Sequence, residues 1–150
     1  MNVNAALSPD DLARACADAM WKEDDASKGL GMQIVEIGPS RATLSMTVRP
    51  EMVNGQRIAH GGFIFTLADS TFAFACNTHN ERAVAAQCHV TFIRPGKLGD
   101  VLVASAREIS RSGRSGIYDV QVTAGDVVIA EFRGHSRTIG GAWLPGTTIK

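Results

Sequence analysis

The chain has 150 residues and carries no formal net charge at pH 7, with 15 basic and 15 acidic side chains. A chain of this length can bury one core, and it lacks the basic excess typical of nucleic-acid or anionic-membrane binding. Hydrophobic residues make up 45% of the sequence, which excludes a disordered polar chain. We therefore expect one domain over 1–150, with its core at about 11–141 and a loose tail at 142–150.

The sequence also lacks targeting and metal-binding signals. The N-terminus has no basic flank followed by an apolar run, and no apolar stretch is long enough to span a membrane. Cys16, Cys76 and Cys88 are odd in number and lie in apolar surroundings, which indicates reduced thiols. The histidines and cysteines show no metal-ligand spacing. These features predict a cytoplasmic protein without a metal, a membrane partner or a nucleic-acid partner.

The predicted elements begin with a short amphipathic helix. Ser8 is a good capping residue, Pro9 fits the first helical position, and apolar residues recur at helical spacing to about Lys22. The segment DDASKG then reads as a break. Two strands follow at 31–37 and 41–48, and the short turn between them predicts a hairpin.

A long apolar segment at 61–78 is predicted to be the main helix. It is apolar nearly all round, which indicates a buried helix rather than a surface one. Four strands follow at 84–93, 100–110, 116–123 and 127–138, and their short connections predict antiparallel neighbours. A helix on one face of an antiparallel sheet is an α+β fold.

Asp69 is the one charged residue of the long helix. An unpaired ionised carboxylate costs roughly several kcal/mol in an apolar interior, so its presence needs a reason. The hydroxyl groups of Thr66, Ser70 and Thr71 could satisfy it structurally. In an apolar pocket it could instead act as a general base on water or as a nucleophile. The pattern by itself leaves both hypotheses open.

His60, Gly61 and Gly62 stand where the long helix begins. The first amides of a helix lack internal partners, and two glycines let a ligand oxygen come close to them. Such amides suit a carbonyl that becomes an oxyanion, although Gly-Gly before a helix is also a common turn. Asn54, in the preceding loop, could orient a water or bind a carbonyl, or simply form a turn before Gly55.

The spacing of Gly61 and Asp69 has a geometric consequence. Eight positions of one helix correspond to ~12 Å along its axis, so the two groups cannot both reach one carbonyl carbon. If they cooperate, the Gly61 amide of one chain must meet Asp69 of another. A two-fold dimer with antiparallel long helices would form two equivalent sites. The chemical hypothesis therefore predicts a homo-oligomer.

The segment 54–77 has the pattern NG....HGG.IF.LAD..FA.ACN, and FIRPGKLGD, GIYDV and FRGHSRTIGG follow it. On these motifs the sequence resembles the hotdog-fold acyl-CoA thioesterases of the phenylacetic acid degradation (PaaI) type, over about 11–141. The resemblance implies a long central helix wrapped by a curved antiparallel sheet of about six strands. It also implies a tetramer built as a dimer of dimers, and no cofactor besides the coenzyme A of the substrate.

The resemblance further implies roles for individual residues. The helix-borne acid of the family falls on Asp69, the amide that polarises the thioester carbonyl on Gly61, the loop asparagine on Asn54 and a supporting histidine on His60. Some relatives hold the hydrolytic water with a Ser or Thr hydroxyl, where this sequence has Ala73 and Ala85. Whether Asp69 attacks directly or activates water therefore stays open.

For the coenzyme A portion, the expected contacts are cations for its phosphates and apolar groups for its pantetheine arm. The residues predicted to bind substrate are Gly62, Phe92, Arg94, Pro95, Lys97, Arg111 and Arg114. The family resemblance favours an aryl-acetyl or hydroxylated aryl-acetyl CoA ester. A hotdog hydratase or dehydratase and a non-catalytic acyl-CoA-binding protein are the alternative functions.

Overall fold

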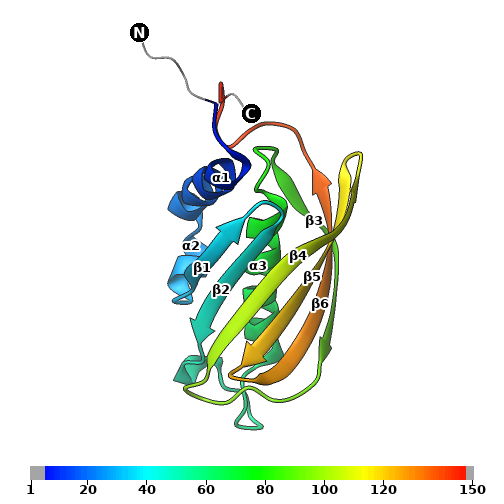
Figure 1. The fold of residues 1–150 in the computed structure, drawn as a ribbon. Helices are drawn as coiled ribbons and strands as arrows, with labels where there is room; N and C mark the ends of the chain where they lie inside the picture. The colour runs from blue at the N-terminus through cyan, green and yellow to red at the C-terminus, as the bar shows by residue number, and fades with distance from the viewer. Residues whose placement is uncertain (1–5, 148–150) are drawn as a thin grey trace.

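A sixteen-residue helix, α3 (Gly61–Cys76), lies across one face of a curved antiparallel sheet (Figure 1). The computed structural model describes residues 6–147. The sheet has six strands in the order β1-β2-β4-β5-β6-β3. Their bounds are β1 Gln33–Gly38, β2 Arg41–Thr47, β3 Ala83–Phe92, β4 Val101–Ser112, β5 Ser115–Ala124 and β6 Val127–Thr138. This arrangement confirms the predicted α+β hotdog fold.

Two helices precede the sheet, where the sequence predicts one. In α1 (Pro9–Glu23), the Ser8 side chain accepts from the Asp11 amide at 3.2 Å, as its capping position predicts. The DDASKG segment, predicted to be a break, instead contains α2 (Asp25–Gly29). Its cap is Asp24, whose carboxylate accepts from the Ser27 amide at 2.9 Å and so satisfies one of the free amides.

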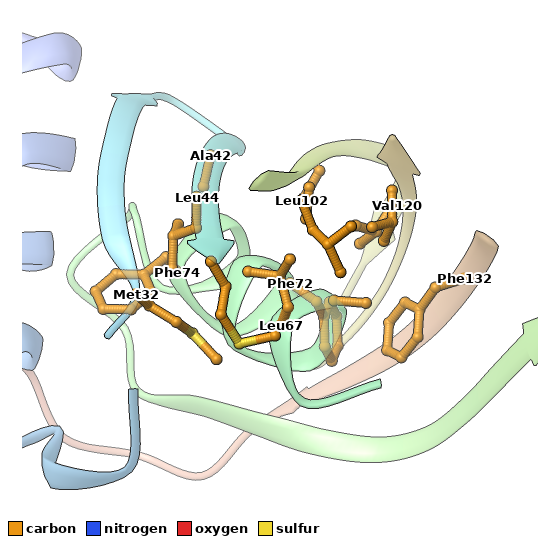
Figure 2. Packing of buried hydrophobic residues seen from close by; sticks show 14 of the residues in the cluster. Met32, Ala42, Leu44, Leu67, Phe72, Phe74, Leu102, Val120 and Phe132 are labelled. Atoms are coloured by element: carbon orange, nitrogen blue, oxygen red, sulfur yellow. The ribbon is translucent and has the colours of Figure 1, made fainter. Parts of the chain in front are cut away.

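The core lies between α3 and the concave side of the sheet. Figure 2 shows Leu67 and Phe72 of α3 packed among sheet residues such as Val120. The Phe72 ring lies 5.7 Å from the Tyr118 ring and 5.9 Å from the Phe132 ring, between centroids. The same ring also lies over the backbone of β6, where a Cβ on Gly134 would come within 2.8 Å of it.

The connection after β3 does not form the predicted pair with β4. Instead β3 pairs with β6 at the edge of the sheet, and β4 lies between β2 and β5. The chain stays on β6 beyond the strand, because the Ile93 and Arg94 amides both donate to the Ile129 carbonyl. It then passes the end of the molecule where α3 starts and enters β4, which pairs with β2 (Figure 1). This connection is longer than a hairpin turn, which lets the strands separate.

One side of α3 is not covered by its own chain, although the sequence predicts burial nearly all round. Gly62, Thr66, Asp69 and Ala73 recur at helical spacing and are exposed or half-buried. The neighbouring strand β3 is also largely exposed, and its outer edge has no partner within 6–147. We call this stripe of α3 together with β3 the open face.

The C-terminal segment is anchored farther than the sequence predicts. It has no regular secondary structure after β6, but the Trp143 indole donates to Asn77 Oδ1 at 2.9 Å. The Leu144 amide donates to Asn80 Oδ1 at 2.8 Å. The expectation of a loose tail from 142 therefore does not hold at these two residues, and 148–150 lie outside the described part.

The contact between Gly134 and Phe72 makes a stability prediction. Gly134→Ala adds a methyl group where the ring already lies, and overpacking of this kind costs about 1–3 kcal/mol. Gly29→Ala is the control, because nothing lies within 4 Å of its added methyl group. Urea denaturation should show a lower free energy of unfolding for Gly134→Ala alone. Equal stability of both variants would contradict the close packing.

Candidate active site

The start of α3 presents one free backbone amide. His60 is the capping residue, and its Nδ1 accepts from the Gly62 amide at 2.9 Å. A neutral imidazole that accepts at Nδ1 carries its proton on Nε2. The Gly61 amide has no partner among the described residues, and it lies at the positive end of the helix dipole. This cap therefore occupies one amide and leaves its neighbour for a ligand oxygen.

A cavity of about 560 Å³ opens at this end of the helix. The Phe92 ring lies against Gly61, where an added Cβ would come within 2.9 Å of it. Only glycine therefore allows the ring and the helix to approach this closely. The cavity brings together five of the predicted site residues, namely Asn54, Gly61, Phe92, Arg94 and Pro95.

Asn54 shapes the loop that leads to the helix. Its Oδ1 accepts from the Gln56 amide at 3.0 Å and from the Ile58 amide at 3.3 Å. Asn54 therefore does form a turn, which is one of the two roles that the sequence left open. Its Nδ2 has no hydrogen-bond partner in the described part of the chain, and the residue lines the cavity beside Gly61. The same side chain can hold the loop and still donate to a ligand.

Asp69 lies in a second cavity, of about 370 Å³, on the open face. Burial raises the pKa of its carboxyl group above the ordinary range, and a hydrogen bond from the Cys88 thiol at 3.9 Å opposes this rise. Desolvation disfavours the charged form because the surrounding walls cannot solvate it. A carboxylate held this way is a better proton acceptor than a fully hydrated one.

The hydroxyl groups that the sequence offers as partners for Asp69 bond elsewhere. Thr66 Oγ1 donates to the Gly62 carbonyl, Thr71 Oγ1 donates to the Leu67 carbonyl, and Ser70 Oγ bonds Ser27 Oγ. The hypothesis that these hydroxyl groups satisfy the Asp69 carboxylate is therefore wrong. The sequence interpretation missed Cys88 as a partner, although the alternation of its strand was an available signal.

The two cavities share no lining residue. Gly61 and Asp69 belong to one straight helix and lie ~12 Å apart along its axis, as the spacing predicts. Helix α3 thus places an amide donor at one end and a carboxylate near its middle, in two separate cavities.

The predicted cations belong to two segments at opposite ends of the sheet, the connection between β3 and β4 and the tip of the β4–β5 hairpin (Figure 1). Arg94 donates to the Val128 carbonyl at 3.2 Å, and Lys97 is exposed close by in the same connection. Arg111 pairs with Glu108 at 3.3 Å, and Arg114 donates to the Thr138 carbonyl at 3.1 Å. Within one chain the four residues therefore do not form a single anion site.

The thiols near Asp69 are poor nucleophiles. Burial raises the pKa of Cys76 to about 12 and that of Cys88 to about 11, and the Asp69 charge adds to both shifts. Thiolates are therefore scarce at neutral pH. Within 6–147 no group of three His, Cys, Asp or Glu side chains could hold a metal ion. No helix in that range is long and apolar enough to cross a membrane.

The fold and the motifs define the class of protein. A family model described as the thioesterase superfamily matches residues 56–131, which is half of the chain, and the chain belongs to this family. The chain is 41% identical over 126 residues to the acyl-coenzyme A thioesterase PaaI of Escherichia coli K12. That alignment covers 83% of this chain and 90% of the relative.

Solved structures agree with this assignment. The E. coli PaaI protein from the phenylacetic acid degradation operon superposes with a TM-score of 0.86 at 39% identity, covering 87% of this chain and 96% of that one. A point mutant of the phenylacetic acid degradation protein PaaI from Thermus thermophilus gives a TM-score of 0.73 at 34% identity. It covers 75% of this chain and 97% of that one.

The raised pKa of Asp69 makes a stability prediction with a definite sign. Because the folded chain binds this proton more tightly than the unfolded chain, ionised Asp69 destabilises the fold at neutral pH. This destabilisation is complete at pH values above the pKa of Asp69 in the folded chain. It disappears at pH values below the pKa of an aspartate in the unfolded chain, about 3.9. Asp69→Asn should therefore unfold at or above the wild-type temperature at pH 7, with the difference shrinking as the pH falls toward about 4.

Asp119→Asn is the matched control with the opposite sign. The Arg133 guanidinium donates to Asp119 at 2.6 Å and lowers the pKa of that carboxyl group, so its charge stabilises the fold at neutral pH. This variant should unfold at a lower temperature than the wild type at pH 7, and the two unfolding temperatures should converge in acid. A clear loss of stability at pH 7 in Asp69→Asn as well would contradict the assigned penalty.

Proposed function

We propose that the protein is an acyl-CoA thioesterase that hydrolyses an aryl-acetyl or hydroxylated aryl-acetyl CoA ester to the free acid and coenzyme A. The proposal is carried by two groups of the same helix: the Gly61 amide, which has no partner within 6–147, and Asp69, whose pKa is raised. Membership of the thioesterase superfamily and the name of the E. coli relative support the reaction class.

In the proposed mechanism the thioester carbonyl oxygen accepts from the Gly61 amide. The helix dipole and this donor stabilise the negative charge that develops on the oxygen in the transition state. The His60 side chain accepts a hydrogen bond from the Gly62 amide. Its proposed role is therefore to stabilise the first turn of α3 rather than to transfer protons.

If Asp69 of a second chain acts as a base, it takes a proton from water, the hydroxyl group adds to the carbonyl carbon, the C–S bond breaks, and the proton passes to the sulfur of coenzyme A. If Asp69 attacks the carbonyl carbon itself, the C–S bond breaks to leave a mixed anhydride on Asp69, and water then hydrolyses this anhydride to the free acid and supplies the proton of the coenzyme A thiol.

The open face is where the second chain would pack. It offers the edge of β3 that has no partner within 6–147, the uncovered stripe of α3, and exposed apolar side chains that include Val84 and Phe92. Pairing two β3 edges about a two-fold axis would satisfy the free backbone groups and make the α3 helices antiparallel. The Gly61 end of each helix would then approach Asp69 of the other. The proposed tetramer is a pair of such dimers.

The same two-fold symmetry would bring the four predicted phosphate-binding cations to one side of each shared cleft. In an antiparallel dimer the far end of one sheet lies beside the near end of the other. Arg111 and Arg114 of one chain would then lie on the same side as Arg94 and Lys97 of its partner. Four cations around one cleft would suit the phosphates of coenzyme A, and Phe92 and Pro95 would line the path of the pantetheine arm.

The reaction can be tested directly with Asp69→Asn. Asparagine has nearly the same shape but cannot act as a base or nucleophile, so thiol release from phenylacetyl-CoA should fall at least about 100-fold. In the wild type, kcat/KM should decline as the pH falls through the raised pKa of Asp69. Near-wild-type hydrolysis in the variant would refute the role of Asp69. Addition of water to an enoyl-CoA without thiol release would favour a hydratase.

A complementation experiment tests the shared site. Gly61→Val blocks the amide and collides with Phe92, while Asp69→Asn removes the carboxylate. A mixed dimer of the two variants keeps one site with an intact Gly61 and an intact Asp69. Unfolding and refolding the two inactive proteins together should restore about a quarter of the wild-type activity, because half of the dimers are mixed. If both groups acted within one chain, no activity would return.

A further inference from the structure

The cavity beside Asp69 is lined by segments that lie far apart in the sequence and is open on one side. Asp69 and Ala73 of α3 line it, and so does Met20 of α1. Arg82, just before β3, and Trp143 of the C-terminal segment complete the wall at the end away from Gly61. Neither Arg82 nor Trp143 belongs to the motifs that identify the family.

Arg82 and Trp143 hold each other in place. The guanidinium carbon of Arg82 lies 4.0 Å from the centroid of the Trp143 indole ring, a cation–π contact. Arg82 Nε donates to the Ala142 carbonyl at 3.3 Å. The indole in turn donates to Asn77 Oδ1, and Asn77 Nδ2 donates to the Ala83 and Ala73 carbonyls. The end wall is therefore fixed to both α3 and β3.

The size and lining of the cavity suit an apolar group. A dry cavity of about 150 Å³ can hold a benzene molecule, and this one measures about 370 Å³. Its lining includes Phe72, Ala73, Val84, Ala85, Ile139 and Trp143. An aromatic ring attached to a carbonyl near Asp69 would point along α3 toward Asn77 and the end wall.

Arg82 supplies the polar group at the far end of this cavity. Its Nε donates to the Ala142 carbonyl, but its terminal amino groups make no hydrogen bond with any residue in 6–147. Arginine keeps its charge and offers donors in a fixed plane, and here the plane is held by the indole. Arg82 is exposed to solvent, but an acyl group that reaches it must pass along the apolar lining beside the negative charge of Asp69, so an uncharged acceptor is favoured over a carboxylate.

We propose that Arg82, positioned by Trp143, selects acyl groups that are apolar along their length and carry an uncharged hydrogen-bond acceptor, such as a hydroxyl, at the far end. This inference rests on the proposed thioesterase function and assigns a specificity-determining residue to the same site. A hydroxyl on the ring accepts from the guanidinium, whereas an unsubstituted ring leaves those donors without a partner.

The test compares 4-hydroxyphenylacetyl-CoA with phenylacetyl-CoA. In the wild type, kcat/KM should favour the hydroxylated ester by about tenfold or more, the effect of one hydrogen bond to a charged donor. In Arg82→Met, which keeps the length of the side chain, the ratio should fall toward one, mainly through KM. Arg82→Lys should restore part of the preference. Arg107→Met, which changes an exposed arginine outside these cavities, should keep the wild-type ratio.

Two outcomes would overturn the assignment. Arg82→Met with the wild-type ratio would show that the guanidinium does not contact the acyl group. An equal loss for both esters would show that Arg82 only anchors the C-terminal segment.

A binding measurement separates this inference from the proposed function. Thioether analogues of the two esters cannot be hydrolysed, and calorimetry should show the same preference for the hydroxylated analogue in the wild type and its loss in Arg82→Met. If the wild type hydrolyses no ester but shows this difference, the thioesterase proposal fails and the Arg82 assignment stands. If hydrolysis occurs without the difference, the Arg82 assignment alone fails.

Discussion

The ring of Phe72 lies directly over the backbone of Gly134, and this contact fixes how α3 sits on the sheet. Because the ring also contacts Tyr118 and Phe132, the helix cannot rotate without opening a void in the core. Leu67 and Phe72 therefore pack on the sheet, and Asp69, one turn before Phe72, is left at the side of the helix next to β3, where it contacts Cys88. The place of the candidate carboxylate is thus a consequence of core packing, and the open face follows from the same rotation.

The first turn of α3 leaves the Gly61 backbone amide available as a hydrogen-bond donor to a ligand. His60 satisfies the Gly62 amide and Phe92 covers Gly61, yet the Gly61 amide is left without a partner in 6–147. An unpartnered helix amide and a partly desolvated carboxylate each lower the stability of the fold. Both costs fall on the groups that the proposed chemistry requires, as is common where activity and stability compete.

One straight helix carries both halves of the proposed site but cannot bring them together. The distance between Gly61 and Asp69 is set by helix geometry, and no side-chain rearrangement within one chain changes it. In the proposed dimer, a second copy in antiparallel orientation would bring the two groups together at two equivalent sites, and it would also cover the edge of β3. Reaction and assembly would therefore depend on the same surface. In this arrangement Arg82 and Trp143 lie at the end of the cavity away from the amide, where the acyl group would end.

The sequence by itself determined the local features: the long apolar helix, the β1–β2 hairpin, the last strand at Val127–Thr138, and the spacing of Gly61 and Asp69. Each is encoded by residues close together in the chain, through periodicity and capping. Only the tertiary structure decided that β3 pairs with β6, that Cys88 rather than a neighbouring hydroxyl contacts Asp69, and that Trp143 returns to Asn77. These contacts join residues far apart in the chain, and they depend on how the whole sheet closes around α3, which no local pattern records.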